Sequence, residues 1–484
     1  MSGRRTWPIV PVMVACCLAR PAWSFDPLLA GRSVPPTASA GLIPGDAPCS
    51  FGPVSQPLLL AEAVGRGLCH NPKTREAWAD VKVRAAAVGV ARAAYLPTVS
   101  GNWQGVRDDS VTDVSGHPQL SSHSAATVRS ESVTLNWVLF DFGGRSAALQ
   151  NASSLLAAAR ATQDTTLQDE FATVAKDWYA VQAAQGALDA ARDIEGMTRD
   201  TMVAAQARVD HGAAPVTDAL QAQTQHDDAV YNLTKAEGDA QTALGRLASD
   251  MGLAPDTALA VPAATDVQPP DRSYGDSVSQ LIDVVKRTHP GILAAQAQLD
   301  AANAKVAQTR AEGLPSVSLV ARYSHNNQPA SLGLGIPTYP ATGHDAYIGV
   351  QVTIPFFEGF GRHYQVRQAE AEAGRQQAVV DETVERVQLD VWTSWQTLRT
   401  ATQNATHTEA ALKNARLAFE AAGQRYEHGV GSILELLNTQ AALATARGKR
   451  IEALTDWSYA RLDLAAKLGR LDMDSVAVST TGSK

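Results

Sequence analysis

Hydrophobic residues recur every seven positions over two long stretches of the chain. The later series runs from Val384 to Tyr426, and the earlier one runs from Leu167 to Val209, where only Glu195 interrupts it. A sustained seven-residue period is typical of helices that pack side by side along their length. The pattern therefore predicts long helices over about 145–209 and 362–427, each roughly 100 Å long at about 1.5 Å per residue.

Shorter helical segments flank each long helix. Residues 73–96 and 215–252 flank the first, and residues 291–314 and 433–469 flank the second. The two short segments of each half add up to about 93 Å, which is nearly the length of one long helix. We therefore expect each pair to lie end to end beside a long helix, as the wall of a tube would require.

Between the short and the long helices the pattern changes to a period of two. Alternation of apolar and polar residues predicts strands with one apolar face. The four segments with this pattern are about 98–106, 130–140, 316–324 and 346–356. The connections, about 107–129 and 325–346, are rich in Ser, Asp, Gly, Pro and Asn and are expected to be exposed loops.

The four strands allow two interpretations. Two hairpins packed on a soluble core is one, and a transmembrane β-barrel with strands of about 9 to 11 residues is the other. An export signal, aromatic residues beside the strands and the lack of another apolar element to cover them favour the barrel. Unpaired strand edges do not persist in lipid, and four strands are too few to enclose a lumen. Several copies of the chain would therefore pool their strands.

The whole arrangement occurs twice, at a shift of about 217 residues. The segment from Arg208 to Gly212 matches the segment from Arg425 to Gly429, and the match continues to Gln223 and Gln440. The fold class is therefore mainly α, with an internal duplication. Repeat 1 covers about 58–252, a Pro-rich linker covers 253–276, and repeat 2 covers 277–471.

The N-terminus has the features of an export signal. Arg4 and Arg5 precede a short apolar run and a small-residue cleavage site at Ala22-Trp23-Ser24, so a signal peptide is expected over 1–24. The alternative is a lipoprotein signal in which Cys16 is acylated. The extension 25–57 and the tail 472–484 have no pattern of regular structure, and no other run reaches the roughly 18 apolar residues of a spanning helix.

Composition and cysteine content narrow the functional class. The 49 acidic and 41 basic residues give a net charge of −8, and no basic cluster occurs, which argues against nucleic-acid binding. After removal of a signal peptide, Cys49 and Cys69 remain; in an oxidising compartment a disulfide is favoured, with two separate buried thiols as the alternative. The scattered histidines lack zinc-ligand spacing, and the Gly-x-Gly pairs lack a nucleotide fingerprint. We expect no catalytic residue, metal or cofactor.

Two kinds of motif mark the ends of the long helices. At each strand-to-helix step, glycines would let the chain bend and aromatics would suit the membrane–water boundary, with simple hydrophobic plugs as the alternative. These step residues are Phe140, Phe142, Gly143, Gly144, Phe356, Phe357, Gly359 and Gly361. At the far ends lie turns that contain Gly212, Pro215, Gly429 and Gly431. Asp218 and Glu435 follow in the first turn of the returning helices, where acidic residues suit the helix dipole.

Together these features resemble the TolC family of outer-membrane efflux and secretion channels. The likeness covers about 58–471 and includes the duplication, the Asn71-Pro72 and Leu96-Pro97 pairs, the Phe-Asp-Phe-Gly-Gly-Arg step and the tip motif. It implies a homotrimer in the outer membrane, with a 12-stranded barrel and a coiled-coil helical tunnel in the periplasm. Within the family the chain looks most like members that export an adenylate cyclase-haemolysin toxin.

The resemblance also implies partners and a gate. A periplasmic adaptor and an inner-membrane ABC transporter would dock on the tunnel of a type I secretion system, and the turns with Gly212, Pro215, Gly429 and Gly431 are the candidates for adaptor docking. Asp218 and Glu435 would ring the periplasmic entrance, with Arg208 and Arg425 as further gate candidates. Asn438 stands where a second acidic residue is expected, and an arginine expected near Ser432 is absent. The alternatives are a channel for small-molecule or metal efflux and a periplasmic coiled-coil adaptor without a pore.

Overall fold

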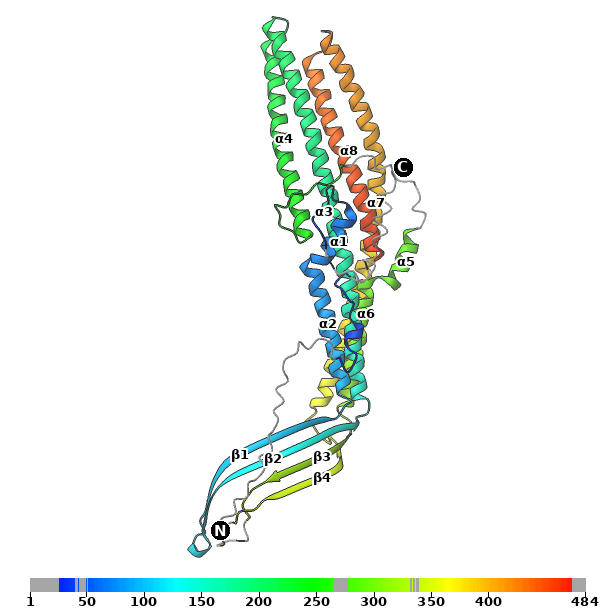
Figure 1. Cartoon of the computed structure of the whole chain (residues 1–484). Helices are drawn as coiled ribbons and strands as arrows, with labels where there is room; N and C mark the ends of the chain where they lie inside the picture. The colour runs from blue at the N-terminus through cyan, green and yellow to red at the C-terminus, as the bar shows by residue number, and fades with distance from the viewer. Residues whose placement is uncertain are drawn as a thin grey trace.

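A computed structural model describes residues 26–39, 42, 49, 51–263, 277–330, 333, 336 and 339–471. The expected signal peptide, the tail 472–484 and residues 264–276 of the expected linker lie outside these ranges. The described chain is elongated, with a sheet at one end and the tips of two helical hairpins at the other (Figure 1).

Two helices of 67 residues each form the long axis of the molecule. They are α3, Gly144–Asp210, and α7, Gly361–Glu427, and their bounds lie within one residue of the predicted ones. Helices α2, Pro72–Ala93, and α4, Val216–Asp250, both pack against α3, one beyond the other (Figure 1). The second half repeats this with α6, Pro290–Ala311, and α8, Ile433–Lys467, against α7.

Local signals explain where the shorter helices begin. The Asn71 side chain accepts a hydrogen bond from the Lys73 amide at 2.9 Å, and Pro72 occupies the first turn of α2. His289 and Pro290 start α6 in the same way. Such caps satisfy amides that have no partner within the helix. A short helix precedes each cap and was not predicted from the sequence. These helices are α1, Leu60–His70, before α2, and α5, Val278–Thr288, before α6.

The four strands form one antiparallel sheet in chain order. Their bounds are β1 Thr98–Thr112, β2 Ser122–Phe140, β3 Ser316–Asn326 and β4 Gly343–Thr353. Because β2 pairs with β3, the sheet joins the two repeats. Among the described strands, β1 and β4 are the edges, and each has one side without a strand partner.

The first hairpin is longer than predicted, and this corrects the expected loop 107–129. Strands β1 and β2 stay in register from Thr98 opposite Asn136 to Thr112 opposite Ser122. The extended part is polar, but Asp109 and His123 interact across the ladder at 2.6 Å. Backbone pairing therefore continues where the side chains give little strand signal, as expected when β-propensity depends strongly on context.

The last strand is displaced from its predicted bounds of 346–356. It begins at Gly343 and ends at Thr353, so part of the expected loop 325–346 is strand. Pro355 explains the earlier end, because proline has no amide hydrogen to donate to a ladder. Phe356 consequently lies beyond the strand, with 91 % of its surface exposed.

The core lies in the helical body. One cluster surrounds Phe171 and Val174 of α3, and a second surrounds Val391 and Leu398 of α7. In the described ranges, no strand residue belongs to a core cluster. Among the helices that the structure describes, none combines the length and apolar character needed to cross a membrane.

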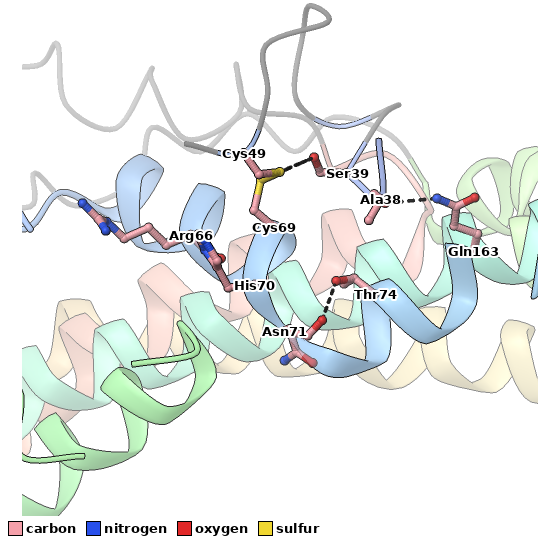
Figure 2. Close-up of a disulfide and its surroundings, with 9 residues drawn as sticks. All are labelled: Ala38, Ser39, Cys49, Arg66, Cys69, His70, Asn71, Thr74 and Gln163. Atoms are coloured by element: carbon pink, nitrogen blue, oxygen red, sulfur yellow. Dashed lines mark hydrogen bonds between the residues drawn. A yellow bond between two sulfur atoms is a disulfide. The ribbon is translucent and has the colours of Figure 1, made fainter. Parts of the chain in front are cut away.

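The N-terminal segment 26–39 lies against α2 and α3. Trp78 donates to the carbonyl of Pro35 at 3.0 Å, and Gln163 donates to the carbonyl of Ala38 at 3.0 Å. Cys49 and Cys69 form the disulfide that the sequence favoured, and it joins the extension to α1 beside Ser39 (Figure 2). The described part of the extension contains only a short 3-10 turn at Gly31–Ser33, in line with its lack of pattern.

Candidate functional site

The candidate site lies at the tips, where each long helix reverses direction. Gly212 and Gly429 have left-handed backbones with φ of 69° and 74°, which glycine adopts without a steric cost. After each helix end, an amide bonds back to the carbonyl of Arg208 or Arg425, as in the common glycine-terminated helix ends. At Gly431, a Cβ would lie 3.0 Å from atoms of Arg425 and Tyr426, so this turn leaves little room for a side chain.

The returning helices begin with the expected acidic residues. Asp218 lies in the first turn of α4 and Glu435 in the first turn of α8. The Ser432 hydroxyl caps α8 by accepting from the Glu435 amide at 3.1 Å, whereas Pro215 occupies the equivalent position before α4. Both carboxylates therefore sit near the positive end of a helix dipole, which stabilises their charge.

The two tip arginines, although repeat mates, have different partners. The Arg208 guanidinium of α3 donates to the carbonyl of Tyr426 at 2.6 Å and to that of Glu427 at 3.1 Å, and it lies 4.2 Å from the centroid of the Tyr426 ring. It thus caps the C-terminal end of α7. Arg425 instead forms an exposed ion pair with Glu435 at 3.5 Å, which is expected to contribute little stability.

An apolar cluster joins the two tips beneath Arg208. Helices α3, α4, α7 and α8 all contribute to this tip cluster, whose buried members are Ala205, Ala222, Ala422, Tyr426, Ile433, Leu436 and Leu437. Burial raises the pKa of the Tyr426 phenol, while Arg208 lowers it and the nearby charge of Asp218 raises it further. The structure therefore brings Arg208, Tyr426 and Asp218 into one neighbourhood. Asn438 lies exposed on α8 one turn after Glu435.

Behind the tip cluster the hairpins separate around a cavity of about 350 Å³. Gln440 of α8 lines it together with Thr198 of α3 and Gln225 of α4. Gln440 is 1 % exposed, and neither of its amide atoms has a hydrogen-bond partner among the described residues. The sequence singled out Gln440 only as part of the repeat; the signal that could have predicted its burial is its helical spacing from the apolar residues Ile433, Leu437 and Leu443 of α8.

The single break in the heptad series is also a buried polar site. Glu195 occupies the seam of α3 with 8 % of its surface exposed. Arg199 pairs with it at 2.5 Å, and the Nδ1 atom of His226 on α4 lies 3.8 Å away. Within the described ranges, no three His, Cys, Asp or Glu side chains gather as a metal site would require.

The strand-to-helix steps combine glycine with strained aromatics. Gly143 and Gly359 have left-handed backbones, and so do Phe142 and Phe360, with φ of 51° and 64°. Gly144 and Gly361 follow directly as the first residues of α3 and α7.

Exposed aromatic pairs lie at the two steps. Phe140 and Phe142 pack edge to face with ring centroids 4.7 Å apart, and Phe357 packs in the same way on Phe360 at 5.3 Å. All four rings keep about half or more of their surface exposed. The structure therefore places the step aromatics on the surface between sheet and helices.

Comparison with known proteins bears on this architecture. The model of the family described as "Outer membrane efflux protein" matches residues 63–253 and 281–470, one match for each repeat. The chain belongs to the outer membrane efflux protein family. It is 32 % identical to Protein CyaE of Bordetella pertussis, over 86 % of each chain. It is 25 % identical to the outer membrane efflux protein BepC of Brucella suis, over 88 % of each chain.

Solved structures agree with this membership in the outer membrane efflux protein family. The outer membrane protein VceC of Vibrio cholerae superposes with a TM-score of 0.72 at 20 % identity, covering 85 % of this chain and 96 % of VceC. The predicted family and the predicted fold, a duplicated and mainly helical chain with a small sheet, are confirmed. Membership also places the protein in the outer membrane, with its helical body as a periplasmic tunnel.

Proposed function

We propose that the chain forms a homotrimeric, passive channel-tunnel that serves a type I secretion system. Its cargo would be a protein toxin of the adenylate cyclase-haemolysin class. The proposal is supported by the 32 % identity to CyaE over most of both chains. The alternative function is efflux of small molecules or metals, which the likeness to BepC and the description of the family favour.

The observation that carries the proposal is an exposed apolar face on α4. The matching face of α8 is buried inside the chain. Within the chain, α8 of repeat 2 packs against α3 of repeat 1. At this contact Ile433 is 4 % exposed and Leu437 is 7 % exposed. Their repeat mates on α4, Val216 and Leu220, are 62 % and 57 % exposed. The face of α4 is therefore apolar and repeats a contact surface that repeat 2 uses.

A second copy of the chain fits that face. Within one chain, α8 of repeat 2 packs against α3 of repeat 1. By the internal repeat, α4 should pack in the same way against α7 of a neighbouring copy. Such a contact joins two different surfaces, one from each copy. Repeated contacts of this kind form a closed ring when the rotation that relates one copy to the next divides a full turn evenly. The free sides of β1 and β4 would pair in the same ring, which removes the strand edges that lipid does not tolerate. Three copies give the 12-stranded barrel that the family resemblance implies.

The tips would form the periplasmic entrance. Three copies each of Asp218 and Glu435 give a ring of negative charge, which attracts cations. The turns around Gly212 and Gly429 would receive the periplasmic adaptor, and an inner-membrane ABC transporter would supply the energy. In this assignment the chain is not an enzyme, and the outer-membrane lipid contacts only the sheet.

Planar-bilayer recording and mass measurement test the proposal. Purified protein should be trimeric and should produce discrete conductance steps. Leu220→Asp places a charge on the exposed face of α4 and should weaken closure of the tips without unfolding the chain, whereas the matched variant Leu437→Asp should destabilise the chain itself. A monomer that produces no conductance steps would refute the channel.

Cargo is a separate question with its own test. Cells that lack this chain should retain the toxin and release it again when the gene is restored. Restored resistance to small toxic compounds, without restored toxin release, would favour the efflux alternative.

A further inference from the structure

Gln440 is a buried amide at the contact between α8 and the α3–α4 hairpin. It lies on α8 one turn beyond Leu436 and Leu437 of the tip cluster, on the side that faces the α3–α4 hairpin. Its side chain is almost fully buried, and both its nitrogen and its oxygen are without partners among the described residues. A buried polar group without a partner loses its hydration and gains nothing in return.

The surroundings of Gln440 offer no ready replacement for water. Alanines of α3, α4 and α8 line the cavity beside it together with the polar side chains of Thr198, Gln225, Asn232 and Thr445, and none of these polar groups bonds to Gln440. The Thr198 hydroxyl, which lines the same cavity, already donates to the carbonyl of Glu195 at 2.9 Å. Packing is also loose here, because the hairpins leave about 350 Å³ between them directly behind the tip cluster.

We propose that Gln440 sets how readily the two helical hairpins separate at the entrance. In the closed contact its amide is desolvated, and separation of α8 from the α3–α4 hairpin would hydrate it. The side chain therefore destabilises the closed state relative to the open one and opposes the tip cluster and Arg208, which hold the hairpins together. This inference rests on the proposed function, because it takes the tips as the channel entrance.

The internal repeat places a second glutamine where two copies of the chain would meet. Gln223 is the repeat mate of Gln440 and lies exposed on α4, on the face that awaits a neighbouring chain. In the trimer it would be buried as Gln440 is within one chain. The entrance would then contain six such amides, each of which favours opening.

Replacement of Gln440 by methionine tests the inference directly. Methionine keeps an unbranched side chain of similar length but removes the amide atoms. In planar bilayers, Gln440→Met should lower the ratio of open to closed time at least about fivefold, which is the low end expected for one unpartnered buried group. Gln440→Glu, which buries a charge at the same place, should raise that ratio at neutral pH.

A matched control lies in the same cavity. Gln225 is only half-buried, so its amide already reaches water, and Gln225→Met should leave the ratio near that of the wild type. A second measurement is the melting temperature of the trimer, which Gln440→Met should raise.

The outcomes separate this inference from the proposed function. Discrete channels whose open-to-closed ratio is unchanged or increased in Gln440→Met overturn the role of Gln440 alone, as does a variant that fails to assemble. Absence of channels from the wild-type protein overturns the proposed function and this inference together.

Discussion

Loss of the Arg208 guanidinium should release the contact between the two hairpins at the tips. In Arg208→Met, the carbonyls of Tyr426 and Glu427 lose a donor that lies 2.6 and 3.1 Å away. The charge over the Tyr426 ring and at the end of α7 is lost as well. The apolar stem of the side chain remains, so packing changes little.

The free energy that Arg208→Met removes from the closed contact follows from these interactions. Arg208 is half-buried, so we take about 1 kcal/mol for each hydrogen bond, below the range for fully buried charged donors. The contact with the ring adds about 0.5 kcal/mol at a partly exposed site. The sum, about 2.5 kcal/mol, corresponds to a roughly 70-fold change in the ratio of closed to open tips.

Bilayer conductance of the purified trimer measures this ratio. Arg208→Met should spend far more time open than the wild type, and Arg208→Lys should fall between them because an ammonium group cannot donate from a planar fork. The repeat mate supplies the control: Arg425→Met loses an exposed ion pair worth about 1 kcal/mol at most, so its effect should stay below about fivefold. An intact Arg208→Met trimer with the open time of the wild type would refute the conclusion that the contacts of Arg208 with α7 hold the tips closed.

Three further outcomes are expected. Replacing both Asp218 and Glu435 by Ala should reduce cation selectivity, and unchanged reversal potentials would contradict their place at the entrance. Replacing Cys49 and Cys69 by Ser removes a cross-link that spans 20 positions and should lower the free energy of unfolding by about 3 kcal/mol, measured by denaturant titration under oxidising conditions. Burial and a neighbouring carboxyl raise the pKa of Asp250 from 3.8 to about 7, so the folded state binds this proton more tightly and stability should fall as pH rises between those values. Asp250→Asn should therefore raise the melting temperature at pH 8 but not at pH 4.

Sequence patterns predicted the helical body well because a periodic apolar stripe must face a neighbour. The bounds of α3 and α7 follow from the heptads and the glycine turns. The helices α1 and α5 were missed because each has only 11 residues and is followed at once by the cap of the next helix, at Asn71 or His289. Strand bounds were the weakest part, since the polar residues of β1 and β2 pair through the backbone.

The candidate site was only partly predictable. Helix periodicity shows which face of α8 is buried, but not which helix covers it. The contacts of Arg208 with α7 and of Gln440 with the α3–α4 hairpin depend on how one repeat packs on the other. No local signal in either repeat specifies that packing.

The differences between repeat mates explain how a duplicated chain can build a gate. Arg208 caps the neighbouring long helix, whereas Arg425 pairs with Glu435 beside it. Gln440 is buried against the first repeat, whereas Gln223 is exposed. Each motif therefore meets one partner inside the chain and leaves one face for another copy. By the same repeat, Arg425 would reach the end of α3 in a neighbouring copy as Arg208 reaches the end of α7 within the chain. A ring built in this way can widen at both kinds of contact, and the Arg208 cap and the Gln440 amide act in opposite directions on the one inside the chain.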